Sequence, residues 1–168
     1  ENIYVSLVIP AYNEQENIPT LLQRAGAALE QVGRPFEIII VDDGSTDQTP
    51  RLLEDGMRQY PWLRVIRLQR NAGQSAGFDA GFRAAHGELI ATIDADLQND
   101  PEELPRLVKM LEEHGCDMIT GWRQKRQDSK FRLFQTRMAN RIRNHISKET
   151  IQDSASSLKL YKRQCLDG

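Results

Sequence analysis

The sequence has no apolar run close to the roughly 20 residues that a membrane-spanning helix requires, so we expect no such helix in these 168 residues. We also expect no signal peptide, because Glu1-Asn2-Ile3 lead directly into a strand-like run. Cysteine is scarce: Cys116 and Cys165 form no CxxC pair or other metal-ligand spacing. This favours reduced thiols in a cytosolic protein, with a single disulfide as the alternative. The length suits one domain.

Charge is unevenly distributed along the chain. The net charge is −2, from 22 Lys or Arg and 24 Asp or Glu. The segment from Trp122 to Lys148, here called the basic segment, contains nine basic residues and one acid, Asp128. Its charge is therefore +8, and the remainder of the chain carries −10. The basic segment is suited to meet a negatively charged partner.

Short apolar runs alternate with segments of helical periodicity. Five runs are typical of strands: Tyr4–Ile9, Phe36–Val41, Leu63–Leu68, Glu88–Ile93 and Asp117–Thr120. Four helices are predicted between them: Ile18 to Val32; a second from Thr49 with Leu52, Leu53 and Met57; Gln74 to His86 with Gly87 as C-terminal cap; and a fourth with Asp100 as N-cap and Leu104, Leu107, Val108 and Leu111 on its core face. This alternation predicts an α/β fold with a mostly parallel sheet and helices on both faces.

Polar and glycine residues follow each predicted strand. The strand ends are Pro10–Glu14, Asp42–Ser45, Arg70–Gln74, Asp94–Asp96 and Gly121–Arg123. The carboxyl ends of parallel strands meet at one edge of the sheet, where open α/β sheets bind their ligands. We therefore predict the functional site at this edge.

Asp94 and Asp96 follow a buried strand with one residue between them. In an extended chain, residues i and i+2 point to the same side, so both carboxylates are expected to face one spot. Two buried like charges repel each other unless a cation lies between them. Gln98 adds a neutral oxygen, and such donors suit Mg²⁺ or Mn²⁺ bound together with substrate phosphates. The alternative is a turn with a structural role only.

A second acidic pair, Asp42-Asp43, precedes Gly44 and Ser45. Gly44 and Ser45 are typical of a turn. A carboxylate of the pair can accept a hydrogen bond from a base N–H or a ribose hydroxyl. We therefore favour a binding role over a purely structural turn.

The segment Gly73–Gly77 matches the G-x-S-x-G nucleophile elbow of serine hydrolases. However, Gly77 and Gly81 are spaced as on a helix, which favours a small-residue helix face packed closely on its neighbour. The three histidines have no evident triad role. A serine hydrolase is therefore disfavoured, and these glycines make no dinucleotide fingerprint, which should follow the first strand.

The basic segment also has an apolar periodicity. Its apolar residues recur at helical spacing: Phe131, Phe134, Met138, Ile142 and Ile146. Two interpretations stay open, an amphipathic helix packed on this domain and an interfacial helix on anionic lipid. Nucleic acid is disfavoured as a partner, because no aromatic stacking platform is visible and the overall balance is acidic.

In their order, these motifs resemble the family 2 glycosyltransferases of the GT-A (Rossmann-like) fold, and among them the polyprenyl- or dolichyl-phosphate glycosyltransferases. The likeness covers nearly the whole chain and rests on seven blocks: Val8–Glu14, Val41–Asp47, Asn71–Gln74, Asp94–Gln98, Thr120–Arg123, Thr136–Asn140 and Asp153–Lys159. The last block departs around Ser156 from a Gly-Cys pair common in the closest relatives. The resemblance implies a nucleotide-sugar-binding core over residues 1–121 and a basic, helical acceptor-side segment over residues 122–168 of the same domain.

The resemblance also implies roles for individual residues. The nucleotide would be held by Pro10, Ala11, Tyr12, Glu14, Val41, Asp43, Gly73, Gln74, Asp94 and Ala95. The metal ion, Mg²⁺ or Mn²⁺, would be held by Asp96 and Gln98, and the acceptor phosphate by Arg123, Arg132 and Arg137. Asp94, Asp96, Arg123 and Arg137 would form the catalytic set.

The implied activity is inverting, metal-dependent transfer of a sugar from a nucleotide-sugar to a polyprenyl phosphate at the cytoplasmic face of a membrane. The likeness of Asp96–Pro101 to bacterial relatives favours UDP over GDP in the donor. The acceptor phosphate is already anionic, so no strong general base is expected. Three alternatives stay open: a haloacid-dehalogenase-like phosphatase, a nucleotidyltransferase and a non-enzymatic module that binds anionic membranes.

Overall fold

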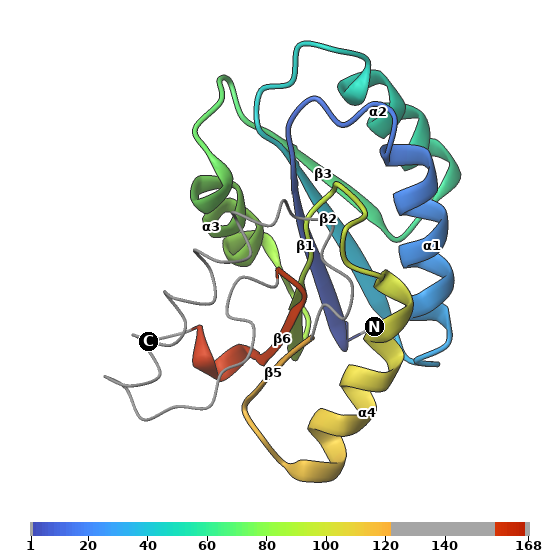
Figure 1. Cartoon of the computed structure of the whole chain (residues 1–168), viewed down its shortest axis with the longest axis vertical. Coiled ribbons are helices and arrows are strands. Elements are labelled where there is room, and N and C mark those ends of the chain that lie inside the picture. Colours follow the sequence, from blue (N-terminus) through green and yellow to red (C-terminus); the bar gives the residue numbers. More distant parts are fainter. Residues whose placement is uncertain (1, 122–156, 167–168) are drawn as a thin grey trace, which may run out of the picture.

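The computed structural model describes residues 2–121 and 157–166. Its centre is a six-stranded sheet in the order β3-β2-β1-β4-β6-β5 (Figure 1). The strands are β1 (Val5–Ala11), β2 (Phe36–Asp42), β3 (Leu63–Arg67), β4 (Leu89–Thr92), β5 (Met118–Thr120) and β6 (Lys159–Lys162). β1 to β4 pair in parallel, whereas β6 lies antiparallel between β4 and β5. The predicted α/β fold with a mostly parallel sheet is confirmed.

The helices lie on both faces of the sheet. They are α1 (Ile18–Glu30), α2 (Thr49–Gln59), α3 (Gln74–Ala84) and α4 (Leu104–His114), and a 3₁₀ turn, η1 (Pro101–Glu103), precedes α4. Figure 1 shows α1, α2 and α4 on one face and α3 on the other. No helix in the described part of the chain is both long and apolar enough to cross a bilayer.

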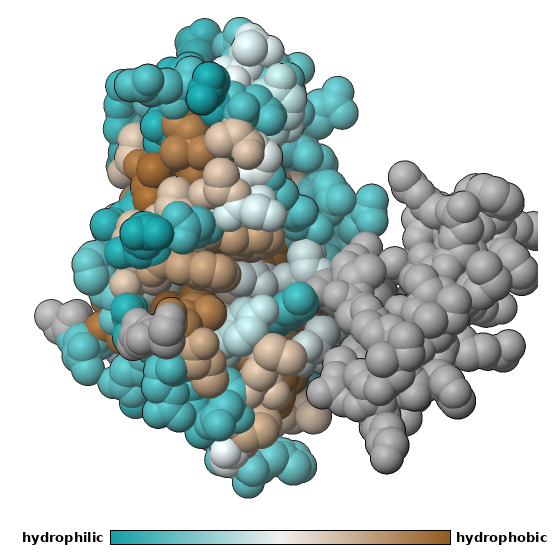
Figure 2. All heavy atoms as spheres, turned by 90° about the vertical axis from the view of Figure 1, so that its left-hand side faces the viewer, coloured by the Kyte–Doolittle hydropathy of each residue, from teal (hydrophilic) through white to brown (hydrophobic). Residues whose placement is uncertain are grey.

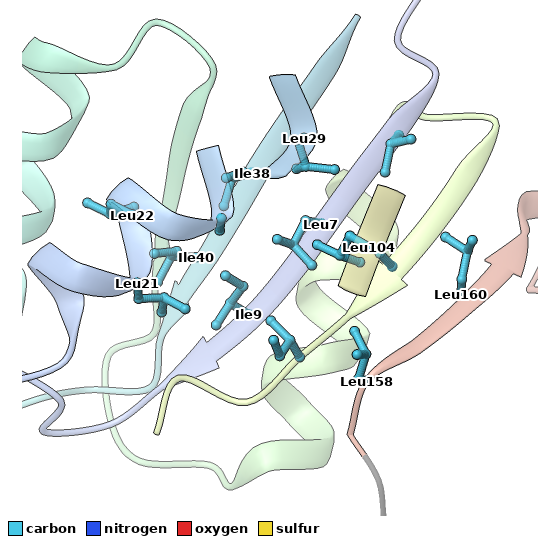
Figure 3. Close-up of a cluster of buried hydrophobic side chains, with 14 of the residues drawn as sticks. Leu7, Ile9, Leu21, Leu22, Leu29, Ile38, Ile40, Leu104, Leu158 and Leu160 are labelled. Atoms are coloured by element: carbon cyan, nitrogen blue, oxygen red, sulfur yellow. The ribbon is translucent and has the colours of Figure 1, made fainter. Parts of the chain in front are cut away.

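The main core lies between the sheet and the helices α1, α2 and α4. Figure 3 shows its side chains, which come from strands and helices far apart in the sequence: Leu7, Ile9, Leu21, Leu22, Leu29, Ile38, Ile40, Leu104, Leu158 and Leu160. The strands alternate, so that Val8, Ile39 and Val41 point to the opposite face and pack under α3. Each face of the sheet therefore has its own apolar cluster.

Strand β6 was not predicted from the sequence. Only Leu160 among its four residues is buried, and its neighbours Lys159 and Tyr161 line the groove on the α3 face. Leu158, just before the strand, is also buried. Two alternating leucines are too weak a pattern to predict a strand from the sequence. In the structure they anchor β6 in the sheet.

One detail of the predicted helices is wrong. α3 ends at Ala84, where Ala85 is extended, so Gly87 is not its C-terminal cap. A Cβ at Gly87 would instead lie 2.5 Å from the backbone nitrogen of Ser6, so glycine is needed there for close packing. On α2, Leu53 is buried whereas Met57 is 42% exposed.

Other helix predictions are confirmed. The side chain of Asp100 accepts a hydrogen bond from the backbone N–H of Glu102, as an N-cap does. The predicted core face of α4, Leu104, Leu107, Val108 and Leu111, is buried. The close packing predicted for Gly77 and Gly81 is also present, because added Cβ atoms would lie 2.9 Å from Pro10 and 2.2 Å from Val8.

The α3 side of the sheet has a groove next to β6. Between α3 and β6 lies a groove of about 400 Å³, whose lining includes Phe78 and Phe82 of α3 and Tyr161 of β6. Figure 2 views the molecule from this side and shows apolar surface between hydrophilic regions. Ser157, which precedes β6, also lines this groove.

Candidate active site at the carboxyl edge of the sheet

The loops that follow β1 and β2 are joined by a dense set of hydrogen bonds. Asn13, whose φ is +53°, donates its backbone N–H to Ser45 Oγ at 2.9 Å and accepts from the backbone N–H of Thr46 at 2.8 Å. The backbone N–H of Glu14 donates to Thr49 Oγ1 at 2.9 Å. These bonds hold the two loops together as one rigid part of the sheet edge.

The two acids at the end of β2 are both buried and have different partners. Asp42 accepts from the backbone N–H of Ser45 at 2.9 Å and lies 3.4 Å from the guanidinium of Arg67. The carboxylate of Asp43 accepts from the backbone N–H groups of Ala72 and Gly73, at 2.7 and 2.8 Å. Asp43 therefore holds the loop after β3 in place, a role that the sequence did not predict.

The loop after β3 is joined to the turn after β4 by a side-chain contact. Gly73, with φ of +91°, precedes α3, and Gln74 is the first residue of that helix. The side-chain amide of Gln74 donates a hydrogen bond to Asp94 Oδ1. Together with Asp43, this contact links the ends of β2, β3 and β4 at one edge of the sheet, where we predicted the site.

The turn from Asp94 to Asn99, here called the Asp94–Asn99 turn, does not continue β4. The strand ends at Thr92, and Leu97 has a left-handed φ of +58°. The carboxylate of Asp96 accepts from the backbone N–H of Gln98 at 3.0 Å. The expectation that the two aspartates continue the strand is wrong, because β4 ends at Thr92 and the chain turns at Ala95 and Asp96.

Sequence reasoning gave no role to Ser157, although it flagged the block Asp153–Lys159. In the structure the Ser157 hydroxyl accepts hydrogen bonds from the backbone N–H of Asp94 and the side-chain amide of Asn99, at 3.2 and 2.6 Å. The only signal in the sequence was the position of Ser157 in that block.

The residues predicted to hold the nucleotide fall into two groups. Pro10, Ala11, Val41, Asp43 and Ala95 are buried, whereas Tyr12, Glu14, Gly73, Gln74 and Asp94 are at least partly exposed. Tyr12, directly after β1, is 45% exposed. Ala11 and Ala95 belong to the main core and Val41 to the cluster under α3, so these residues support the edge of the sheet.

The acceptor-side predictions lie outside the described residues. This holds for Arg123, Arg132 and Arg137, and for the predicted amphipathic helix of the basic segment. Cys116 and Cys165 lie within the described part, and both are free thiols there, as expected.

The oxygen donors of the Asp94–Asn99 turn fit a hard divalent cation. Asp94 and Asp96 supply carboxylates and Gln98 an amide oxygen, all within five residues. Within residues 2–121 and 157–166, no group of three or more His, Cys, Asp or Glu side chains forms a metal cage. Mg²⁺ commonly takes only one or two carboxylates and completes its shell with water and substrate phosphates, so the oxygen donors of the turn suit Mg²⁺ or the similarly hard Mn²⁺.

The fold and the residues at the carboxyl edge of the sheet indicate a class of protein. A mostly parallel α/β sheet that gathers carboxylates and amides at its carboxyl edge is typical of proteins that bind a ligand there, among them many nucleotide-binding enzymes. The particular family follows from the sequence, because residues 6–168 match the model of Glycosyl transferase family 2. The chain belongs to this family.

Known relatives agree with this assignment. The chain is 43% identical over 164 residues to an undecaprenyl-phosphate 4-deoxy-4-formamido-L-arabinose transferase of Klebsiella pneumoniae subsp. pneumoniae, and 45% identical over 165 residues to the protein of the same name from Serratia proteamaculans. In both comparisons 97% of this chain is aligned with 50% of the relative. The chain thus spans about half the length of these relatives.

Solved structures show the same fold. The mannosyltransferase PcManGT from Pyrobaculum calidifontis, in complex with GDP-Man and Mn²⁺, superposes with a TM-score of 0.69 at 24% identity, over 99% of this chain and 46% of that one. Glucosyl-3-phosphoglycerate synthase from Mycobacterium tuberculosis, in complex with UDP, gives 0.76 at 21% identity, over 98% and 58%. Both likenesses support the predicted GT-A fold.

Proposed function

We propose that this chain is the catalytic unit of an enzyme that transfers a sugar from a nucleotide-sugar to a polyprenyl phosphate, with Mg²⁺ or Mn²⁺ and with inversion at the anomeric carbon. The family is that of glycosyltransferases. Two relatives above 40% identity carry the name of an undecaprenyl-phosphate sugar transferase. UDP is the favoured nucleotide, on the likeness of Asp96–Pro101 to bacterial relatives.

The observation that carries the proposal is the link between Gln74 and Asp94. It brings the loop after β3, the start of α3 and the Asp94–Asn99 turn to one place at the carboxyl edge of the sheet. In this arrangement Asp94, Asp96 and Gln98 would hold the divalent ion. The ion would neutralise the charge that develops on the leaving diphosphate.

The residues of the chain would then act by positioning. The loops after β1 and β2, joined through Asn13 and Ser45, would support one side of the nucleotide site. Tyr12, exposed at the end of β1, would contact the base. Arg123, Arg132 and Arg137 would bind the acceptor phosphate, since a guanidinium matches phosphate oxygens with two parallel hydrogen bonds.

The acceptor needs no strong general base. A phosphate monoester is already anionic at neutral pH, so one of its oxygens can attack the anomeric carbon directly while the nucleoside diphosphate leaves from the opposite side. A single displacement of this kind inverts the configuration. Asp94 and Asp96 are therefore assigned to the metal, not to acid–base catalysis.

The proposal places the reaction at the cytoplasmic face of a membrane. A polyprenyl phosphate has a long apolar tail and resides in the bilayer, and the +8 charge of the basic segment suits anionic headgroups.

Thermal-shift measurements with UDP and GDP, each with and without Mn²⁺, test the donor side. A ligand at 100 times its dissociation constant stabilises the folded protein by about 2.7 kcal/mol, which for this size is a shift of roughly 5–10 °C. We expect this shift with UDP and Mn²⁺ together. A metal-independent shift, or no shift with any nucleotide, contradicts the proposal.

A transfer assay tests the acceptor side. Purified protein, a UDP-sugar panel and undecaprenyl phosphate in detergent should yield a lipid-linked sugar with inverted anomeric configuration. Retention of configuration would overturn the single displacement. Release of inorganic phosphate from a phosphate monoester, without use of any nucleotide-sugar, would favour a phosphatase instead.

A further inference from the structure

Ser157 lies opposite the start of the Asp94–Asn99 turn because of the strand register. β6 pairs antiparallel with β4, with Thr92 opposite Lys159. Continuing this register by two residues brings Ser157 opposite Asp94. A residue 63 positions further along the chain thus lies beside the first predicted metal ligand.

The contacts of Ser157 reach both ends of the turn. Its hydroxyl oxygen accepts from the backbone N–H of Asp94 at 3.2 Å and from Asn99 Nδ2 at 2.6 Å. Its backbone carbonyl accepts from Thr92 Oγ1 at 2.7 Å. Asn99 is only 3% exposed, so its amide needs a partner inside the protein. One hydroxyl therefore joins the first and last residues of the turn.

The turn needs such a constraint. Leu97 has φ of +58°, a conformation that costs a non-glycine residue about 1–2 kcal/mol. Strained backbone of this kind persists only where its surroundings determine it, and it is common at functional sites. Ser157, which directly precedes β6, helps to hold the turn in this conformation.

We propose that Ser157 is a positioning residue for sugar transfer: its hydroxyl closes the Asp94–Asn99 turn and so holds Asp94, Asp96 and Gln98 in the geometry that binds the metal ion and the diphosphate. The proposal rests on the proposed function, which assigns the metal to these residues. It adds a coupling between strand β6 and the donor site that runs through one hydroxyl group.

The test compares Ser157→Ala with Ser157→Thr, which keeps a hydroxyl. The measurement is the Mn²⁺ concentration at half-maximal UDP-dependent thermal stabilisation. Loss of a group that orients metal ligands typically weakens metal binding 10–100-fold. We expect Ser157→Ala to raise this concentration about tenfold, and Ser157→Thr to restore most of the difference.

Ser6→Ala is the matched control. The Ser6 hydroxyl is buried and accepts from the backbone N–H groups of His86 and Gly87, at 3.2 and 2.8 Å, while it donates to Glu37. It lies on β1, near the end of the sheet opposite the candidate site. Ser6→Ala should lower the melting temperature without changing the Mn²⁺ dependence. An equal change in Mn²⁺ dependence for both variants would mean that Ser157 acts only through stability, which overturns the proposal.

Hydrogen–deuterium exchange separates this proposal from the proposed function. In Ser157→Ala, amides of the Asp94–Asn99 turn should exchange faster, with the remainder of the sheet unchanged. If the wild-type protein binds no nucleotide, it is the proposed function that fails, and exchange alone decides the role of Ser157 in the turn. Unchanged exchange, or an unchanged Mn²⁺ requirement in a wild type that does bind UDP, overturns the role of Ser157.

Discussion

Asp43, at the end of β2, accepts a hydrogen bond of 2.8 Å from the backbone N–H of Gly73, which precedes α3. Its other carboxylate oxygen accepts from Ala72 at 2.7 Å. The sequence predicted Asp43 as a ligand of the nucleotide, whereas the structure shows it first as the group that places the loop after β3. The loop in turn leads to Gln74, which contacts Asp94. The buried carboxylate of Asp43 is therefore linked, through the loop after β3 and Gln74, to the carboxylate of Asp94.

Asp43→Asn tests this arrangement. An amide has one acceptor oxygen, so one of the two N–H groups would face an N–H₂ donor. We expect the free energy of unfolding to fall by about 1–3 kcal/mol, the cost of an unsatisfied buried group. Urea unfolding measures this loss, and Asp55→Asn, at an exposed site on α2, is the control. An unchanged midpoint and slope would show that the loop does not depend on Asp43.

Asp96→Asn tests the metal assignment. The side chain of Asp96 is half-buried at the turn and accepts from the backbone N–H of Gln98, a bond that an asparagine oxygen can also accept. The fold should therefore remain intact, whereas the loss of one negative charge should weaken the binding of the divalent ion. We expect the Mn²⁺-dependent part of the UDP thermal shift to disappear. Calorimetric binding of UDP with unchanged affinity and unchanged Mn²⁺ dependence would remove Asp96 from the site.

Much of the fold could be predicted from the sequence, because apolar runs and helix periods are local signals. β1 to β4 and the core face of α4 are examples. β6 could not be predicted, since it has one buried residue, Leu160, and its pairing with β4 joins segments about 70 residues apart. Local patterns do not contain such long-range pairing.

The candidate site was predictable in place but not in detail. Strand ends can be found in a sequence, so the carboxyl edge of the sheet followed from them. The partners of Asp43 and the role of Ser157 depend on loops that meet only after folding. The extended geometry assumed for Asp94 and Asp96 was wrong, because β4 ends at Thr92 and a turn follows. Nothing in the sequence around Leu97 signals the left-handed conformation of this turn.

Gly81→Ala should destabilise the protein. A Cβ at this position would lie 2.2 Å from Val8 Cγ1, so α3 must move away from the sheet. Overpacking costs typically about 1–3 kcal/mol, against a helix-propensity gain of about 1 kcal/mol. Val8→Ala removes the obstructing methyl groups, so the double variant should lose less stability than the sum of the single variants. Additive losses in urea unfolding would contradict this close contact.

Protonation of Glu37 is expected to lower the stability of the folded protein in acid. It is a buried carboxylate, and burial acts to raise its pKa, but hydrogen bonds from Ser6, Arg64 and the backbone N–H of His86 hold the pKa below its ordinary value of 4.5. A carboxyl with a lowered pKa in the folded protein contributes stability above pH 4.5 and loses it as the pH falls through the folded value. Glu37→Gln should therefore lower stability near neutral pH and flatten its decline below pH 4.5. Urea unfolding across this range is the measurement, and parallel pH profiles for both proteins would refute the assignment.

We expect arginines of the basic segment to contribute to acceptor binding and not to donor binding. Arg123 and Arg137 are assigned to the acceptor phosphate, and loss of a hydrogen bond to a charged group costs about 1.5–3 kcal/mol. We therefore expect Arg123→Ala and Arg137→Ala to lower transfer to undecaprenyl phosphate about tenfold or more, while the affinity for UDP with Mn²⁺ stays unchanged. Arg126→Ala removes the same charge from the same segment and serves as the control. Because a general attraction to anionic surfaces is screened by salt, activity at high and low ionic strength separates the two effects. Equal losses in transfer and in UDP affinity, or equal losses for all three variants, would remove these two arginines from the acceptor site.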